Sequence, residues 1–355
     1  MEKLLFVVLL ITEIVTLIRQ ITVHVSKREW AKERGITNAS ELILFLLMLL
    51  LPGIDLSFRF KSLLILLIIR LVLSGIVIIL CRKNESRKKT AAIVMGTVFG
   101  IILTGMSMIP AFIFTDYSGR PVSGPYTVAQ SRAILIDDSR LEVNENDGSF
   151  REVPVYFFYP ENTGEFEKSS LPLIIFSHGA FGYYESNAST YLELASNGYI
   201  VVSIEHPYHS LFTKDTNGKI ITVDPGFFNS AMDASSRSEA EVYELTSGWM
   251  DIREADMNFA LDTIIDAARS GIIGDEWFLT NTSEEEIIKI LGITDTDKIG
   301  LMGHSLGGAT AVTVGRREDV SAVIDFDGTM LGEETGFENG NIIVNPEPYD
   351  TPILC

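Results

Sequence analysis

Long apolar stretches in the first third of the chain place the tightest constraint on its fold. Two of them, Ser62–Cys81 and Ala91–Phe114, are almost wholly apolar. A bilayer crossing needs roughly 20 such residues in a helix, which satisfies its own backbone polar groups in lipid. Leu4–Ile18 qualifies when it is extended toward the next loop, and Glu41–Ile54 is shorter. We therefore expect residues 1–116 to form an all-α membrane region with about four transmembrane helices.

The first apolar stretch has an alternative interpretation as a cleaved secretory signal, because Lys3 precedes its apolar core. However, no small-residue cleavage site follows it, and three more apolar stretches do. We therefore expect it to remain as a membrane helix. It carries Glu13, and the third stretch carries Arg70. Charges inside a membrane are often functional, but the simpler interpretation is that these two pair with each other or snorkel to the surface.

Positive charges gather in two of the connecting segments. Five Lys or Arg residues lie in each of Arg19–Ser40 and Arg82–Thr90, whereas the segment between the second and third stretches has only Arg59 and Lys61. Basic loops tend to stay in the cytoplasm. We therefore expect a multi-pass protein of the cell membrane, with its N-terminus and everything after Phe114 on the extracytoplasmic side.

The remainder of the chain is strongly acidic. Up to Thr115 there are 14 Lys and Arg against 7 Asp and Glu, so the totals of 28 and 47 leave 14 against 40 for the rest. Such a charge repels nucleic acid, and we expect no nucleic-acid partner. The two cysteines, Cys81 and Cys355, are too few for a disulfide framework or a zinc pattern.

Strand-like and helix-like segments alternate after a connector, residues 117–150, that also holds the first strands. Strands are expected at Pro154–Pro160, Leu171–Ala180, Tyr199–Ser210, Lys298–Ser305, Val320–Met330 and Thr351–Cys355. Helices are expected at Ser186–Tyr199, Ser238–Ser270, Ser283–Ile293 and Leu306–Arg316. Several of the strands are continuously apolar, which is typical of strands buried on both faces. The expected fold class is therefore α/β, with a mostly parallel sheet and helices on both faces.

The stretch KIGLMGHSLGGAT, Lys298–Thr310, carries the strongest chemical signal. Its G-x-S-x-G pattern follows an expected strand and opens an expected helix, so Ser305 is expected on a tight turn with its hydroxyl exposed. Gly303 and Gly307 relieve the crowding that such a turn creates. The alternative is a glycine-rich turn with a chance serine. We interpret Ser305 as a catalytic nucleophile.

Two further segments fit around such a serine. The turn from Ser177 to Gly182 follows a buried strand, and it predicts an oxyanion hole made by the backbone amides of Ala180 and Leu306. The strand VIDFDGTM offers two carboxylates, Asp325 and Asp327. In a strand both would point the same way, and Asp327, nearer the turn, is the better candidate for the acid. Each segment also has a purely structural alternative, an ordinary turn or a helix cap.

These segments resemble the platelet-activating factor acetylhydrolase family of α/β-hydrolases. The likeness lies in the block from Phe176 to His209, in GHSLGGAT and in VIDFDGTM, and it covers roughly residues 151–355. It implies Ser305 as nucleophile, Asp327 as acid, and Ala180 and Leu306 as oxyanion donors. It also implies cleavage of short or oxidised acyl esters of phospholipids without metal or cofactor. The membrane region departs from the secreted members of that family.

The base that takes the serine proton is the difficulty. In this fold the chain order is serine, acid, histidine, yet none of the five histidines follows Ser305. We expect His178 and His206 at the rim of the pocket, and His206 is a weak alternative base. We also expect this chain to be a C-terminally incomplete copy, lacking about 80 to 150 residues on ordinary domain lengths.

Three functional readings follow from these observations. The first is a membrane-anchored serine esterase that acts on ester or phospholipid substrates at the bilayer. The second is a catalytically inactive membrane-bound sensor or binding protein that retains the fold. The third is a transporter-like membrane module, which the small number of polar residues in the apolar stretches disfavours. The intact serine pattern favours the first reading.

Overall fold

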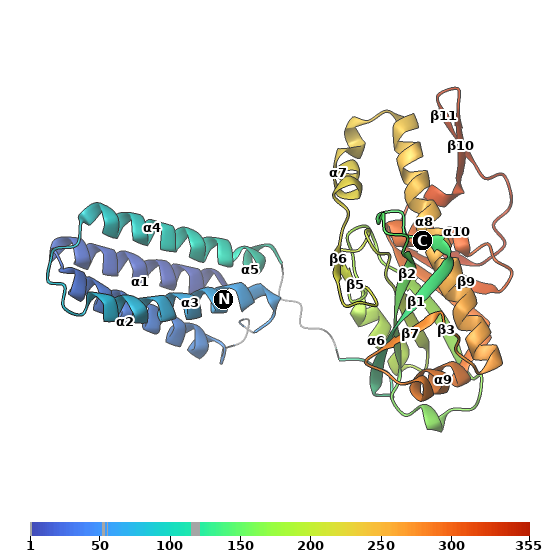
Figure 1. Cartoon of the computed structure of the whole chain (residues 1–355), viewed down its shortest axis with the longest axis horizontal. Helices are drawn as coiled ribbons and strands as arrows, with labels where there is room; N and C mark the ends of the chain where they lie inside the picture. Colours follow the sequence, from blue (N-terminus) through green and yellow to red (C-terminus); the bar gives the residue numbers. More distant parts are fainter. Residues whose placement is uncertain (1, 52–53, 55, 115–120) are drawn as a thin grey trace. The chain divides into compact units, whose positions relative to one another are not determined.

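The computed structural model describes residues 2–51, 54, 56–114 and 121–355. The chain divides into two compact units, Met1–Gly119 and Arg120–Cys355 (Figure 1). The first unit is all helical and the second is built on a β-sheet, as the change of sequence pattern predicts.

The helical unit consists of long helices lying side by side (Figure 1). The described helices are α1 (Glu2–Thr22), α2 (Lys27–Met48), α3 (Phe58–Cys81), α4 (Thr90–Ser107) and the short α5 (Ile109–Ile113). Their contact surfaces bury an apolar cluster that includes Leu5, Phe45, Phe60 and Leu67. Many Ile and Leu side chains face outward instead, among them Ile65 and Leu80. This surface is typical of helices that face lipid.

Three of the described helices, α1, α3 and α4, are long and apolar enough to cross a membrane. The expected second span, Glu41–Ile54, is instead the end of α2, which already begins at Lys27. The prediction of a loop across Arg19–Ser40 is therefore wrong over most of its length. The reason is a capping box, in which Ser26 and Glu29 satisfy each other's free amides and start the helix early.

Charged side chains occupy the interior of this bundle. Glu13 of α1 binds Arg34 of α2 and Arg70 of α3, and Arg70 Nη1 lies 3.1 Å from Glu41 Oε2. The predicted pairing of Glu13 with Arg70 is confirmed. Asn38 Nδ2 also donates to the carbonyl oxygen of Arg70 at 3.1 Å. The charges of α2 in this region are therefore matched by charges on its neighbours.

The α1–α2 and α3–α4 turns lie at the same end of the bundle. Lys27 N donates to Ser86 O at 2.9 Å, and Lys88 N donates to Val25 O at 3.1 Å. Both turns belong to the basic segments of the sequence. Because they are hydrogen-bonded to each other, the two basic segments share one side of the unit.

The second unit contains a sheet with eight described strands in the order β12-β9-β8-β3-β4-β2-β1-β7. In chain order the strands are β1 (Val128–Leu141), β2 (Phe150–Pro160), β3 (Leu171–Ser177), β4 (Ile200–Ile204), β7 (Trp277–Thr280), β8 (Thr294–His304), β9 (Val320–Phe326) and β12 (Ile353–Leu354). From β12 to β4 all neighbours are parallel, and β2, β1 and β7 add antiparallel pairs. The mostly parallel sheet is confirmed, including the last expected strand.

Helices cover both faces of this sheet. They are α6 (Ala188–Ser196), α8 (Glu239–Ser270), α9 (Glu284–Ile293) and α10 (Leu306–Val314), with single 3-10 turns at Thr163–Glu165, Ala234–Ser236 and Leu331–Glu333. The short helix α7 (Pro225–Asp233) instead packs through Phe227 against α8 and α10. Along β3, Ile174 and Phe176 pack toward α6, whereas Leu173 and Ile175 pack with α8, α9 and α10. The alternation of a strand thus divides one apolar run between two cores.

Several short elements have no clear signal in the sequence. Two small hairpins lie outside the sheet, β5–β6 (Phe212–Lys214 and Ile220–Thr222) and β10–β11 (Glu334–Glu338 and Asn341–Val344). The helix α7 starts with Asp224, whose side chain caps the amide of Phe227, and Pro225 follows at the first helical position. The edge strand β7 has only four residues. Short elements bury too few residues to leave a periodic pattern.

Candidate active site

Ser305 lies on a strained turn between β8 and α10. Its backbone has φ 53° and ψ −123°, a region that residues with a side chain rarely occupy. A Cβ on Gly303 would lie 2.0 Å from the carbonyl oxygen of Gly307, and one on Gly307 would lie 2.1 Å from that of Ser177. Both glycines are therefore required by the close approach of the backbone. This is the geometry expected of a nucleophile on a strand–helix turn.

The predicted oxyanion segment lies directly beside this turn. A Cβ on Gly179 would come within 3.2 Å of Ser305 Cβ. Among the described residues, neither the amide of Ala180 nor that of Leu306 donates a hydrogen bond, and Leu306 is the first residue of α10. Amides in the first turn of a helix have no partner within the helix. Two unused donors therefore flank the serine.

The side chains of the two candidate acids, Asp325 and Asp327, point in different directions, so the expectation that they point the same way is wrong. Asp325 is 3% exposed and accepts a hydrogen bond from Gly328 N at 3.0 Å, whereas Asp327 is exposed. The reason is that β9 ends at Phe326 and Asp327 turns into the left-handed region with φ 54°. Burial raises the pKa of Asp325. Ser305 N donates to Phe326 O at 2.9 Å, so both carboxylates lie near the serine turn.

His178 and His206 do not line the rim of a pocket, and that prediction is wrong. Both side chains are 0% exposed. They follow β3 and β4 as expected, but the chain folds over them and their ring nitrogens are used by internal hydrogen bonds. His304 adjoins Ser305 in sequence, and His24 belongs to the other unit. Within the described part of the chain, Ser305 has no hydrogen-bonded histidine partner.

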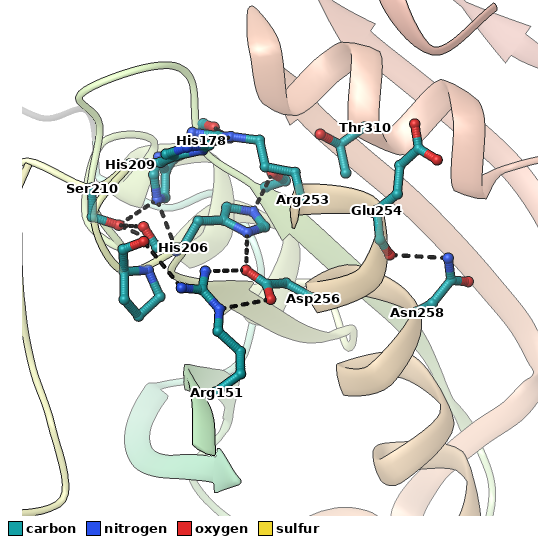
Figure 2. A network of polar contacts seen from close by, with 12 residues as sticks. Arg151, His178, His206, His209, Ser210, Arg253, Glu254, Asp256, Asn258 and Thr310 are labelled. Carbon is teal, nitrogen blue, oxygen red and sulfur yellow. Dashed lines mark hydrogen bonds and ion pairs between the residues drawn. The ribbon is translucent and has the colours of Figure 1, made fainter. Parts of the chain in front are cut away.

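Behind the oxyanion segment lies a buried network of charged and polar groups (Figure 2). Its centre is Asp256 of α8, which accepts from Arg151 Nη2 at 2.6 Å and from His206 Nδ1 at 3.0 Å. Arg151 also donates to Glu142 Oε2 at 2.6 Å. Burial alone would raise the pKa of Asp256, but the Arg151 charge and these hydrogen bonds hold it well below its usual range. Asp256 is therefore ionised and fully paired.

The same network fixes the protonation of His206. Because a carboxylate only accepts, His206 Nδ1 carries the proton and Nε2 accepts from Ser177 Oγ at 2.9 Å. Burial, and then the charge of Arg253, lowers the pKa of His206 to about 4. The ring is therefore neutral at pH 7.

Ser177, His206 and Asp256 thus have the hydrogen-bond order of a catalytic triad, but they are not placed to act as one. Ser177, His206 and Asp256 are each 0% exposed, so no substrate reaches the hydroxyl. Ser177 also lies within β3 and not on a strained turn. The network is a structural support behind the candidate site.

Sequence reasoning missed the charged members of this network. Arg253 and Asp256 lie on the face of α8 that continues through Met257, Ala260 and Ile264 into the core. An arginine and an aspartate inside an apolar helical stripe are unusual, because burying a charge requires partners. The position of these two charges on an apolar face could have indicated a buried network. The prediction considered only the apolar residues of the helix and therefore missed it.

An apolar cluster forms a further wall close to the serine. It joins Leu306 and Ala309 of α10 to Phe227 of α7 and Met250 of α8, with Phe181 and Trp249 packed against it. The Phe181 and Phe227 rings are 5.2 Å apart. The described residues contain no group of three His, Cys, Asp or Glu side chains that would hold a metal ion.

The parallel sheet, the helices on both of its faces and the serine turn between β8 and α10 define the α/β-hydrolase class. Within that class the chain belongs to the platelet-activating factor acetylhydrolase family, since residues 149–339 match the profile described as platelet-activating factor acetylhydrolase, isoform II. The matched region contains β2 to β10 and therefore the whole candidate site.

Individual relatives agree with this assignment. The chain is 29% identical over 172 residues to a platelet-activating factor acetylhydrolase of Canis lupus familiaris, covering 45% of this chain and 34% of that protein. It is 24% identical over 187 residues to a probable 1-alkyl-2-acetylglycerophosphocholine esterase of Arthroderma benhamiae, covering 52% and 38%. The alignments therefore span little more than a third of each relative's length.

Among solved structures, a ferulic acid esterase from Streptomyces cinnamoneus is similar, with 23% identity and a TM-score of 0.40 over 59% of this chain and 63% of that chain. An esterase from Rhizomucor miehei is similar with 14% identity and a TM-score of 0.31 over 61% and 48%.

Proposed function

We propose that the protein is a membrane-anchored serine esterase that forms an acyl-enzyme on Ser305. The observation that carries the proposal is the strained backbone of Ser305, at φ 53° and ψ −123°, beside two amides that find no acceptor within the described part of the chain. A fold retains such strain where the surrounding structure enforces it, and strained residues cluster at active sites. The family assignment supports the same reaction class.

In the proposed reaction Ser305 Oγ attacks the carbonyl carbon of the ester while a general base takes the hydroxyl proton. The carbonyl oxygen gains the electron pair and is bound by the amides of Ala180 and Leu306. The intermediate then expels the alcohol, which takes the proton from the protonated base. Water repeats the sequence on the acyl-enzyme and releases the acid. Asp327 orients the base, and its exposed position supports this role better than the buried, hydrogen-bonded Asp325.

The proposed substrates are carboxylic esters with short acyl chains, including those of phospholipids. The names of the relatives support this class, and so does the apolar wall beside Ser305. An acyl chain would contact Phe181 and Trp249, the partly exposed residues packed against this wall. The carbonyl end would remain at the polar turn.

We also propose that α2 crosses the membrane together with α1, α3 and α4. Its charges Arg34 and Glu41 are paired inside the bundle, so they need not face lipid. With four crossings the N-terminus and the hydrolase unit share one side. The two basic turns, which are hydrogen-bonded to each other, then face the cytoplasm. This arrangement makes the hydrolase unit extracytoplasmic.

The function is tested by ester turnover of the protein expressed from its complete gene, in membranes. The substrates are p-nitrophenyl esters of increasing acyl length, and the variants are Ser305→Ala and Ser321→Ala, an exposed serine of β9. We expect Ser305→Ala to lose several orders of magnitude in kcat and Ser321→Ala to keep the activity of the wild type. Turnover that persists in Ser305→Ala would overturn the proposal.

A second candidate function is a non-catalytic binding protein that retains the fold. One observation favours it, which is that Ser305 has no histidine partner among the described residues. The same experiment separates the two candidates. A wild type without turnover that still binds short-chain phospholipid saturably would be a binding protein.

A further inference from the structure

Arg253 of α8 is a buried cation without a carboxylate of its own. Its side chain is 0% exposed, and among the described residues it forms no salt bridge. Its donors bind the His178 carbonyl oxygen at 2.6 Å, the Gly179 carbonyl oxygen at 3.4 Å and His209 Nδ1 at 3.3 Å. Burial lowers its pKa to about 9, so the guanidinium remains charged at pH 7. Removing a charge from water is costly, so a buried guanidinium needs hydrogen bonds that offset its lost hydration.

The carbonyl oxygens that Arg253 binds belong to the oxyanion segment itself. The carbonyl of Gly179 and the amide of Ala180 are the two ends of one peptide group. Besides Arg253, His178 Nδ1 donates to that carbonyl oxygen at 2.7 Å and Gly182 N at 3.0 Å. In a trans peptide the carbonyl and the amide point in opposite directions. The donors that hold the carbonyl toward the network therefore direct the Ala180 amide away from it.

The serine turn also packs directly against this segment. A Cβ on Gly179 would lie 3.2 Å from both Ser305 Cβ and His304 O. The first turn of α10 also packs against the segment, since a Cβ on Gly307 would meet the carbonyl oxygens of Ser177 and His178 at 2.1 and 2.6 Å. The segment is thus in direct contact with both the guanidinium and the serine turn.

We infer that Arg253 is a positioning residue for the oxyanion hole, because it fixes the Gly179–Ala180 peptide with its amide toward Ser305. The inference rests on the proposed esterase function. Arg253 also places a positive charge behind the two peptide groups that it binds. This charge polarises them toward the network and strengthens the amide as a donor. Arg253 does not itself contact the substrate.

Asp256 and His206 stabilise this arrangement and do not compete with the carbonyl oxygens for the guanidinium of Arg253. Asp256 lies one turn after Arg253 on α8, and its carboxylate accepts hydrogen bonds from Arg151 and His206. Its negative charge still favours the guanidinium, which the like charge of Arg151 disfavours. His206 in turn holds Ser177, the residue before the oxyanion segment. The charges therefore hold Arg253 in place without drawing it away from the carbonyls.

The test compares Arg253→Met and Arg253→Lys with Arg269→Met, in which an exposed arginine of the same helix is changed. The protein is expressed from its complete gene and studied in membranes. The readouts are kcat and KM for p-nitrophenyl acetate and the rate of labelling by a fluorophosphonate, whose phosphoryl oxygen occupies the oxyanion hole. Removing a whole oxyanion donor lowers kcat by about 10²- to 10³-fold, so misplacing one should lower it by about 10- to 100-fold.

We expect Arg253→Met to lower kcat and the labelling rate by the same factor while KM stays unchanged. A lysine cannot bind both carbonyls and His209 at once, so Arg253→Lys should fall between Met and the wild type. A kcat within about threefold of the wild type in a folded Arg253→Met protein, or a loss confined to KM, would overturn the inference. If the Met variant does not fold, a kcat of Arg253→Lys within about threefold of the wild type would overturn the inference instead. If the fluorophosphonate labels the wild type at a residue other than Ser305, the proposed function is overturned, and this inference with it.

Discussion

Replacing Asp256 with Asn should destabilise the hydrolase unit severely. The substitution keeps the shape of the side chain but removes the charge that Arg140, Arg151 and His206 share. Arg151 is buried, with its side chain 4% exposed, and among the described residues it would keep only Glu142 as a charged partner. Breaking a buried ion pair by removing one member costs about 3–5 kcal/mol of unfolding free energy. For a unit of this size that corresponds to a Tm lower by about 6–20 °C.

The assay is urea unfolding of the full chain in detergent, followed by tryptophan fluorescence. A Trp30→Phe background leaves Trp249 and Trp277, which both lie in the hydrolase unit. The matched control is Asp251→Asn, an exposed carboxylate on the same helix, which should change the stability by less than about 0.5 kcal/mol. A loss below about 1 kcal/mol in Asp256→Asn would refute the reasoning, because the network would then be solvated or replaceable.

Three further predictions concern pH, packing and topology. Since the pKa of His206 is lowered to about 4, the unfolded chain binds a proton between about pH 6.5 and 4 that the folded chain excludes, so stability should fall on acidification by up to about 1.4 kcal/mol per pH unit. His178 and His209, whose pKa values burial also lowers, add to this slope, so His206→Asn should reduce it in pH-dependent melting by up to about 1.4 kcal/mol per pH unit, and an unchanged slope would assign it to those other groups. Gly307→Ala should unfold or inactivate the enzyme, whereas Gly292→Ala, where a Cβ meets nothing within 4 Å, should be neutral or stabilising in the same melting assay. An alkaline phosphatase fusion after Tyr126 should be active only outside the cytoplasm, and activity of a cytoplasmic reporter there would contradict four crossings.

Much of the hydrolase unit follows from the sequence, because its signals are local. The apolar runs of β3 and β4 and the glycines around Ser305 indicate strands and a tight turn without knowledge of their neighbours. Ser238 and Gly271 likewise mark the two ends of α8, through a capping box and a left-handed residue. The prediction of the membrane unit is less accurate, since the early start of α2 depends on a short capping box within a charged segment.

What the sequence did not reveal depends on contacts between distant segments. His178 and His206 are placed correctly after their strands, but their burial results from α8 supplying Arg253 and Asp256 from elsewhere in the chain. The different directions of Asp325 and Asp327 depend on where β9 ends, which is at Phe326, four residues before the expected end at Met330. Element ends are the least predictable part of a fold, and here one end decides which carboxylate is exposed.

The most direct test of the central claim is to identify the residue that a fluorophosphonate modifies. The protein expressed from its complete gene would be labelled in membranes, digested and analysed by mass spectrometry. We predict a single adduct on the peptide that carries Ser305, lost in Ser305→Ala and unaffected in Ser321→Ala. An unlabelled Ser305, or an adduct on Ser177 of the buried network, would contradict the assignment of the nucleophile.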